Sequence, residues 1–403
     1  MRICPFIRMF MRLVRRRYFN AGGGARFDLP LADGGSGSVN LVPVVGDLKA
    51  TVTRATAAAA KLSTGLWKLD VASGVARGHY LGWSTAVVAY GGFLSELAAT
   101  NECLHSRDLT NAVWVAGGDQ TTAKTSTGID GVANSCTRLT STIGAATFYQ
   151  AVSGAAVERT FSAFVRRVTG TGTIQIAFQN GITSLDITSL INSTTYTRVT
   201  LTDTVLNPEV GFNISDASNA IDVDCCQLET GPSASTPIVT TTAAVTRNAD
   251  VLVYTGAADF GTGSMYCEAT SIVGTNNTGS GNNAIAISDG TNNERVNIDQ
   301  PNTTTNARLN VSDGGVAQAA ITILSKFALN TTVKLGGAWT TNLVDFAADG
   351  ALGTQDTAAT MPTTNRVYIG CGAAGTQQFA GCVKNVKIWN RALSRDEIDV
   401  LTT

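Results

Sequence analysis

The fold class of this 403-residue chain is decided by two neighbouring stretches, Arg366-Val-Tyr-Ile-Gly-Cys371 and Gly381-Cys-Val-Lys-Asn-Val-Lys-Ile-Trp-Asn-Arg-Ala-Leu-Ser-Arg-Asp-Glu397. Apolar and polar side chains alternate along Arg366–Gly370 and Cys382–Trp389, which is the period-two pattern of a half-buried strand. Ser394 stands three residues before Glu397, the spacing of a capping box that begins a helix. The chain is therefore expected to close with two strands and one short helix.

This closing pattern resembles the last segment of laminin-G/concanavalin-A-like jelly rolls, in the form that occurs at the C-terminus of bacteriophage fibre and spike proteins. In those proteins an Asn-Arg-Ala-Leu-Ser element, here Asn390–Ser394, packs back on the sandwich. The resemblance implies a fold and says little about a ligand.

The composition is that of a protein with many short strands. Charged residues make up only 15% of the chain, and 41 residues are glycine. Low charge with abundant small, polar, β-tolerant residues favours strands and tight turns over long helices or a charge-repelled disordered chain. The length suffices for two or three domains.

Alternating segments separated by turn residues run through the rest of the chain. Before residue 230 the predicted strands include Thr173–Phe178, Tyr196–Leu201, Val210–Ile214 and Ala220–Leu228. After residue 250 they are Met265–Ser271, Ala284–Ser288, Arg295–Asp299, Ala307–Val311, Ala319–Leu324, Val333–Trp339 and Leu343–Ala347. Short strands at this spacing predict all-β sandwiches.

A second resemblance is carried by a series of motifs upstream: Thr53-Arg-Ala-Thr56, Gly92-Phe-Leu-Ser-Glu96, Ser106-Arg-Asp-Leu-Thr-Asn-Ala-Val-Trp114, Phe161-Ser-Ala-Phe-Val-Arg166, Gln227-Leu-Glu-Thr-Gly-Pro232 and Thr246-Arg-Asn-Ala-Asp250. Together they look like a phage adhesin module in which a preamble precedes a carbohydrate-binding-module-like jelly roll. The chain departs from that pattern at Cys225-Cys226 and in a shortened stretch after Pro232.

We therefore expect an all-β fold of two tandem jelly-roll β-sandwiches preceded by an extended N-terminal anchoring arm. Residues 1–49 are expected to form a basic arm with a Gly-rich linker, and residues 50–100 an irregular β connector. Residues 101–245 are expected to form the carbohydrate-binding-module-like jelly roll, and residues 246–403 the laminin-G/concanavalin-A-like jelly roll.

The arm differs from the rest of the chain in its charge. Residues 1–49 hold eight Lys/Arg and three Asp/Glu, while all later residues hold 21 and 27. We interpret Arg15, Arg16, Arg17, Tyr18 and Phe19 as a virion anchor that docks into an acidic, partly apolar groove on a larger assembly; the alternative is an irregular tail. Nucleic acid is not an expected partner, because the bulk of the chain is acidic and phosphate would repel it.

The eight cysteines form no C-x-x-C pair, so we expect neither a zinc site nor a dense disulfide framework. Free, buried thiols fit assembly in a reducing bacterial cytoplasm, although Cys371 and Cys382 could meet across neighbouring strands. A membrane span is not expected, because the chain holds no run of eighteen uncharged apolar residues. Arg8 and Arg12 interrupt the apolar start, which does not resemble a secretion signal.

We do not expect enzyme activity. His79 and His105 are the histidines of the chain, and we interpret both as structural or surface residues rather than members of a Ser-His-Asp triad. The E-x-D-x-x-E strand that marks glucanases of the concanavalin-A-like fold does not occur, and glutamates are few.

Candidate ligand-binding residues are aromatic side chains for sugars and paired carboxylates for a metal. Trp114, Trp339 and Trp389 could each stack on a sugar ring, and Trp339 is the favoured one because it lies close to a predicted turn. Asp222 and Asp224 lie two apart on one predicted strand, so their carboxylates could hold a structural Ca²⁺. Such a pair also occurs on any solvated strand face. No other cofactor is expected.

The two resemblances imply a structural protein of a bacteriophage virion, on head or tail, that displays β-sandwiches for adhesion to host-surface polysaccharide. We expect it to contact capsid, portal or tail proteins through its arm and to form a homotrimer. Two alternatives remain open: a capsid decoration or cement protein without glycan binding, and a glycan depolymerase.

Overall fold

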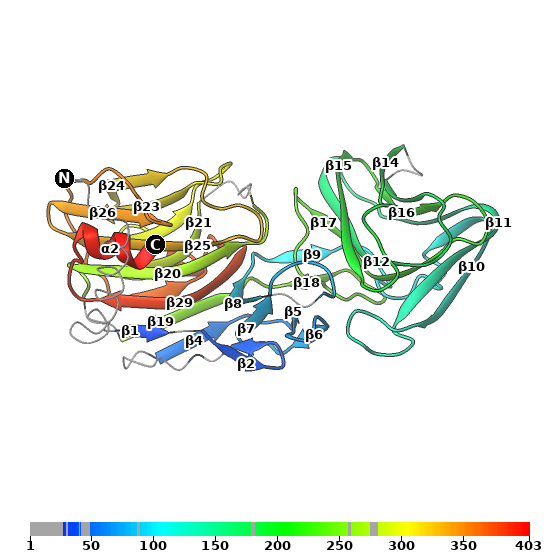
Figure 1. Cartoon of the computed structure of the whole chain (residues 1–403), viewed down its shortest axis with the longest axis horizontal. Helices are drawn as coiled ribbons and strands as arrows, with labels where there is room; N and C mark the ends of the chain where they lie inside the picture. Colours follow the sequence, from blue (N-terminus) through cyan, green and yellow to red (C-terminus); the bar gives the residue numbers. More distant parts are fainter. Residues whose placement is uncertain are drawn as a thin grey trace, which may run out of the picture.

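The computed structural model describes residues 27–29, 31–39, 41, 49–86, 89–178, 182–256, 259–274 and 281–403. It is an elongated molecule in which two β-sandwich lobes lie end to end (Figure 1). The predicted all-β fold with jelly-roll sandwiches is confirmed.

The lobe that contains the C-terminus is built from two facing sheets. The first sheet has the order β2-β3-β7-β8-β29-β20-β25-β26-β27, and β1 also pairs with β29. Its strands are β1 (Phe27–Leu29), β2 (Asp33–Gly35), β3 (Ser38–Val39), β7 (Arg77–Tyr80), β8 (Tyr90–Ser95), β20 (Gly263–Ser271), β25 (Thr332–Thr340), β26 (Leu343–Ala348), β27 (Ala351–Leu352) and β29 (Gly381–Trp389).

The second sheet of this lobe has the order β24-β23-β22-β21-β28-β19-β4. Its strands are β4 (Lys49–Thr53), β19 (Val251–Thr255), β21 (Asn282–Ser288), β22 (Arg295–Gln300), β23 (Ala307–Asp313), β24 (Val316–Ile323) and β28 (Arg366–Ile369). Apolar side chains from both sheets form one continuous buried core. This packing is what the period-two alternation of the strands requires.

The chain ends as the capping-box pattern predicts. Ser394 caps α2 (Arg395–Thr402): its side chain accepts the backbone N–H of Glu397, whose carboxylate in turn accepts the backbone N–H of Ser394. A short 3₁₀ turn, η2 (Ala373–Gly375), precedes β29. On α2, Ile398 is buried above Gly336 of β25, where a Cβ would lie 3.0 Å from the Ile398 side chain. The helix therefore closes the outer side of the first sheet.

The middle lobe is one bent sheet of order β14-β13-β16-β11-β17-β12-β15, with β10 paired to β11. The first half of β11 pairs with β17 and its second half with β16, so this long strand takes part in both layers. Phe161 meets Phe178 and Phe212 across the core between the layers. The strands are β10 (Val115–Ser126), β11 (Cys136–Ala151), β12 (Val157–Thr169), β13 (Ile174–Phe178), β14 (Thr183–Asp186), β15 (Thr197–Val205), β16 (Glu209–Ile214) and β17 (Ala220–Thr230).

The described residues between Phe27 and Ser95 depart from the expected arm and connector, because most of their strands complete the C-terminal lobe. Phe27 of β1 pairs with Ile388, and Phe93 of β8 pairs with Val383, so both strands cover the same edge of β29. Val52 of β4 pairs with Leu252 at the edge of the second sheet. Exposed strand edges leave backbone N–H and C=O groups unpaired. The N-terminal segment satisfies them here.

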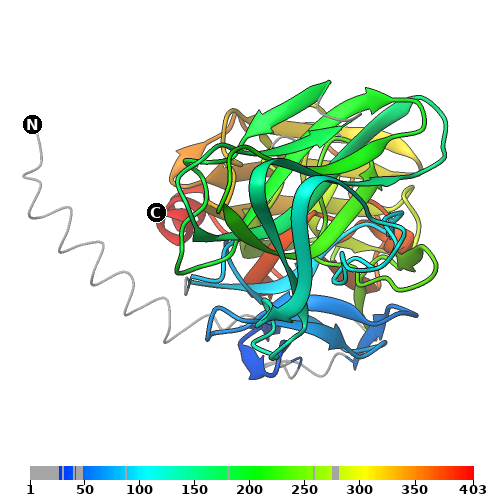
Figure 2. The ribbon, with the colours of Figure 1, turned by 90° about the vertical axis from the view of Figure 1, so that its right-hand side faces the viewer.

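A hairpin from the same segment reaches the middle lobe. It consists of β5 (Ala58–Lys61) and β6 (Trp67–Val71). Trp67 is buried, meets Phe164 of β12 edge-on at 5.4 Å, and stacks on Trp83. A second short pair, β9 (Ala99–Asn101) with β18 (Val245–Arg247), forms the crossing between the lobes. Figures 1 and 2 show the described strands before residue 81 in blue along one side of the molecule.

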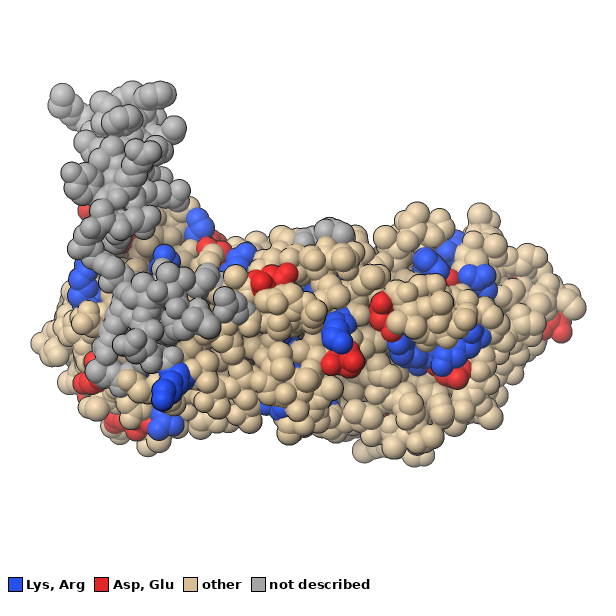
Figure 3. All heavy atoms as spheres, turned by 90° about the horizontal axis from the view of Figure 1, so that it is seen from below, with Lys and Arg blue, Asp and Glu red and all other residues tan. Residues whose placement is uncertain are grey.

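The proposed anchor residues Arg15, Arg16, Arg17, Tyr18 and Phe19 lie outside the described residues. Seven cysteines lie within the described residues, and all seven are buried free thiols, as predicted. Cys371 and Cys382 belong to different apolar clusters and do not pair. The face drawn in Figure 3 is mostly uncharged, with small clusters of both signs.

Candidate functional site

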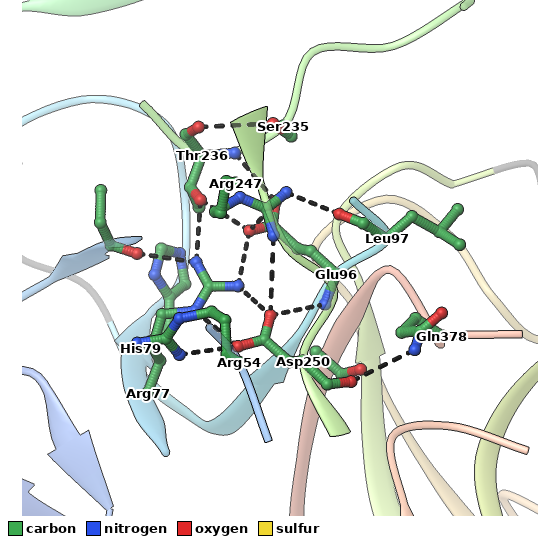
Figure 4. A network of polar contacts seen from close by, with 12 residues as sticks. Arg54, Arg77, His79, Glu96, Leu97, Ser235, Thr236, Arg247, Asp250 and Gln378 are labelled. Atoms are coloured by element: carbon green, nitrogen blue, oxygen red, sulfur yellow. Dashed lines mark hydrogen bonds and ion pairs between the residues drawn. The ribbon is translucent and has the colours of Figure 1, made fainter. Parts of the chain in front are cut away.

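A buried ionic cluster lies where the N-terminal segment, the middle lobe and the C-terminal lobe meet (Figure 4). At its centre, the Asp250 carboxylate is fully buried. Its Oδ1 atom accepts hydrogen bonds from Arg54 Nη1 at 2.9 Å and Arg77 Nε at 3.2 Å. Its Oδ2 atom accepts from Arg77 Nη2 and from the backbone N–H of Glu96 at 3.1 Å, with Arg247 Nη1 at 3.7 Å.

Glu96 is the second acid of this ionic cluster. Its Oε2 atom lies 2.9 Å from Arg77 Nη2 and 3.6 Å from Arg247 Nη2. Thr236 donates its backbone N–H to Glu96 Oε1 at 2.8 Å and its hydroxyl to Glu96 Oε2 at 2.6 Å. Burial by itself would raise the pKa of Glu96, but Arg247, Arg77 and Thr236 hold that pKa well below its usual range. Glu96 is therefore a carboxylate at neutral pH.

The members of the cluster come from segments far apart in the sequence. Arg54 follows β4, Arg77 lies on β7 and Glu96 follows β8. Arg247 ends β18, and Thr236 lies in the loop that leaves the middle lobe. A buried ion is tolerated only when charges and hydrogen bonds compensate its lost hydration. The cluster therefore acts as a latch that requires all these segments to be in place at once.

A groove lies beside this latch, between the two lobes. Two adjoining hollows, of about 340 and 230 Å³, share Pro232, Ser233, Ala234, Ile272 and Val273. The larger is also lined by Glu96, Leu97, Ala98, Ala99, Glu229, Thr230, Gly231, Ser235, Arg247 and Ala380, and the smaller by Trp83, Thr160, Arg198, Thr200 and Leu329. Each lobe therefore contributes one wall of the groove.

The wall from the middle lobe is held by Gln227 and Glu229 of β17. Glu229 accepts hydrogen bonds from the Ser235 backbone N–H at 2.9 Å and from the Ser235 hydroxyl at 2.6 Å. Gln227 Nε2 donates to Glu229 at 2.6 Å, and Gln227 Oε1 accepts the backbone N–H of Ile238 at 2.7 Å. Burial raises the pKa of Glu229, against the effects of Arg198 and Ser235. These contacts fix the loop that borders the groove.

Arg198 of β15, also in the middle lobe, lines the smaller hollow. Its guanidinium lies over the ring of Trp83 at 4.7 Å and over that of Phe164 at 5.5 Å. Its Nη1 donates to the Ser235 carbonyl, and its Nη2 to the Ser162 hydroxyl at 3.0 Å. Trp83 is half-buried, whereas Leu329 is 55% exposed at the rim. Hydroxyl groups, a cation and apolar side chains therefore line the same groove.

Trp339, the predicted sugar-binding residue, is not at the surface. Its side chain is fully buried between the two sheets of the C-terminal lobe, and its Nε1 donates to the Phe260 carbonyl at 2.7 Å. A Cβ at position 263 would lie 2.6 Å from the indole, so glycine at this position leaves the space that the Trp339 side chain occupies. The prediction that Trp339 binds sugar was wrong, because its side chain points into the core. Trp114 and Trp389 are buried as well.

Asp222 and Asp224 are held by arginines rather than arranged around a cation site. Arg138 and Arg166 donate to Asp222 at 2.9 and 2.7 Å. Arg107 donates to both oxygens of Asp224, at 2.7 and 2.9 Å. Burial raises the pKa of Asp222, but the two arginines and Ser126 outweigh it and lower that pKa. Oxygens engaged by guanidinium groups do not fit a Ca²⁺ shell, and no metal-binding cluster occurs among the described residues.

Sequence reasoning did not identify the groove. Arg198 and Trp83 lie in separate parts of the chain, and neither stands in a motif with recognisable spacing. Arg54, Glu96, Arg247 and Asp250 belong to the motifs of the second resemblance, which assigns them no role. Thr-Arg pairs contain Arg54 and Arg247 but also Arg138 and Arg198, which lie outside the cluster, so these pairs do not identify it.

Residues 270–399 match the sequence model of the Laminin_G_3 family, described as the concanavalin A-like lectin/glucanases superfamily. No curated protein matches the chain. Among the described residues, none of the helices is long and apolar enough to cross a membrane.

Three solved structures illustrate what the chain is similar to. The CBM40 of the Ruminococcus gnavus IT-sialidase is 13% identical, with 35% of this chain and 82% of that chain covered and a TM-score of 0.30. A heptameric SAP-like pentraxin from Limulus polyphemus is 9% identical, with coverages of 36% and 72% and a TM-score of 0.29. The binding domain of botulinum neurotoxin serotype G is 11% identical, with coverages of 38% and 40% and a TM-score of 0.29.

Replacing the central acid of the latch should loosen the whole molecule. We expect Asp250→Ala to lower the free energy of unfolding by about 3–5 kcal/mol, because it leaves buried arginines without their shared counter-charge. The exposed Lys68–Asp70 pair supplies the control. Asp70→Ala should change the free energy of unfolding by less than about 1 kcal/mol. Denaturant titration followed by tryptophan fluorescence measures both variants. Equal, small effects of the two substitutions would show that the latch contributes nothing.

The structure also predicts a loss of stability in mild acid. Buried His79 accepts the backbone N–H of Lys61 at 3.2 Å. Burial lowers the pKa of His79 to about 3, Glu96 opposes this, and Arg77 and Lys61 add to it. In the unfolded chain, the His79 side chain takes up a proton at its ordinary pKa of 6.5. A fall in pH below that value therefore favours unfolding.

We expect His79→Gln, which keeps an acceptor and removes the titration, to flatten this dependence by up to about 1.4 kcal/mol per pH unit. Denaturant midpoints at pH 7.5, about 6 and about 5 measure this pH dependence. All three pH values lie above the usual pKa of glutamate, so the comparison avoids the range in which glutamates are protonated. Parallel profiles of the two proteins would contradict the assignment to His79.

Proposed function

We propose that this chain is a structural protein of a bacteriophage particle, anchored through its N-terminal arm, whose sandwiches adhere to glycans of the host surface. The observation that carries the proposal is the groove between the lobes. Apolar Ile272, Val273 and Leu329 lie there beside the exposed, hydroxyl-bearing side chain of Thr200. Sugars present C–H surfaces and O–H groups together, and such mixed walls suit both. The concanavalin A-like match of residues 270–399 supports the same proposal.

The latch makes the groove suitable for adhesion, because it holds the two walls in one relation before any ligand arrives. Thr236, hydrogen-bonded to Glu96, directly follows the groove residues 232–235, and Arg247 lines the groove while pairing with Glu96. A pre-formed site loses less conformational entropy on binding than one that must close. Weak single contacts would gain strength from several copies, and we propose a homotrimer for this reason.

The N-terminal pairing supports a specific orientation of the appendage. Phe27 pairs with Ile388 in the C-terminal lobe, so the arm that precedes it joins the molecule at that lobe. An arm that binds other virion proteins through Arg15–Arg17, Tyr18 and Phe19 would therefore leave the middle lobe pointing outward. In this arrangement the last domain in the sequence lies nearest the particle.

Substitution at the groove rim tests the glycan proposal. We expect Leu329→Arg to weaken binding to purified host-surface polysaccharide by about tenfold or more, because a long cation would fill the smaller hollow. Leu324→Arg is the matched control, because Leu324 is 70% exposed on the same segment and does not line the groove. Biolayer interferometry on immobilised polysaccharide measures both. Absence of binding by the unmodified chain would refute glycan adhesion.

Deletion of residues 1–26 tests the anchor and leaves β1 intact. We expect the shortened chain to keep its glycan affinity and its melting temperature but to be absent from purified particles. Retention on the particle would favour a cement protein that clamps through its domains. Release of reducing ends from the polysaccharide by the full chain would favour a depolymerase instead.

A further inference from the structure

Arg198 differs from the other deeply buried arginines of the described residues. Of the five, Arg54, Arg77, Arg159 and Arg247 each have a carboxylate within ion-pair distance. Arg198 is 8% exposed, and no carboxylate of the described residues lies within 4.0 Å of it. Its Nε atom is buried without a hydrogen-bond partner there. The fold therefore places a cation beside the groove without a direct counter-charge.

The surroundings of Arg198 stabilise its charge only in part. The rings of Trp83 and Phe164 provide cation–π contacts, and two oxygen acceptors take hydrogen bonds from its Nη atoms. Burial lowers the pKa of Arg198, while Glu229 and Glu96 raise it. Glu229 already accepts three hydrogen bonds from Gln227 and Ser235. A buried cation is normally paired, so this one is available to a ligand that brings a negative charge.

We propose that the smaller hollow of the groove binds a sugar residue that carries a carboxylate, with Arg198 as its cationic partner. This inference rests on the proposed glycan adhesion and names the class of glycan. A guanidinium matches a carboxylate in shape and charge. Exposed Thr200 offers a hydroxyl to the rest of the ring, while Ile272 and Leu329 face its C–H groups. An acidic host polysaccharide is therefore the expected receptor.

Paired ligands test the charge without altering the protein. Oligosaccharides of polygalacturonate, alginate and hyaluronan are each compared with their carboxyl-reduced forms, in which the carboxylate is replaced by a hydroxymethyl group. We expect at least one acidic form to bind about tenfold or more tighter than its reduced form, because a hydrogen bond to a charged group is worth about 1.5–3 kcal/mol. Isothermal titration calorimetry at about 0.05 and about 0.3 M salt should show weaker binding of that acid at the higher salt.

A charge placed beside Arg198 tests the location. Thr200→Glu should weaken binding of the acidic form about tenfold more than binding of the reduced form, because the new carboxylate repels the acidic sugar and pairs with Arg198, whereas loss of the Thr200 hydroxyl affects both forms alike. Thr204→Glu is the control, since Thr204 is exposed further along the same strand and does not line the groove. Arg198→Lys, which keeps the charge, should retain the preference for acid.

The outcomes separate this inference from the function on which it rests. Equal affinity for acidic and reduced forms, or binding of neutral glycans alone, would overturn the acidic subsite and leave glycan adhesion standing. Equal effects of Thr200→Glu and Thr204→Glu would move the acid site away from Arg198 and also overturn the inference. Failure of every glycan, including whole host polysaccharide, to bind would overturn both.

Discussion

The structure depends on the pairing of Asp250 and Glu96 with three buried arginines. Asp250 directly precedes β19 of the C-terminal lobe, Glu96 follows β8, and Arg247 belongs to the crossing between the lobes. None of these side chains can be buried alone, since an unpaired ion in the interior costs several kcal/mol. Each segment can therefore take its place only when the others are present. Two sandwiches that could have been independent domains are thereby joined into one body.

The same constraint explains the path of the N-terminal segment. Arg54 and Arg77 must reach Asp250, and the strands that carry or precede them, β7 and β4, lie in different sheets of the C-terminal lobe. The segment thus closes strand edges that would otherwise be open to association with other chains. Between those contacts it sends the β5–β6 hairpin onto the middle lobe. Spatial order in this protein consequently differs from sequence order.

The groove is a by-product of this joining. Its walls belong to different lobes; Glu96 and Arg247 line it as members of the latch, whereas Arg198 lines it from outside the latch. Arg198 illustrates the difference: it is buried against aromatic rings like a core residue, yet it lacks the carboxylate that Arg77 and Arg247 have. A site of this kind requires rigid walls, and the latch supplies them. Stability of the junction and recognition at the groove are thus linked physically.

The sequence by itself determined the strands, the capped helix and the two-sandwich class, because alternation and capping are local properties of the chain. Arg54, Glu96, Arg247 and Asp250 stand in the motifs of the second resemblance, but those motifs did not indicate that the four residues meet. Only the tertiary structure decided which strand edges β1, β4 and β8 cover, that Trp339 faces the core, and that Arg198 borders a groove. Alternation tells which residues share a face, but not what covers that face. Cys225 and Cys226 point to opposite sides of β17 and are both buried, because the β5–β6 hairpin covers the side that alternation alone would leave to solvent.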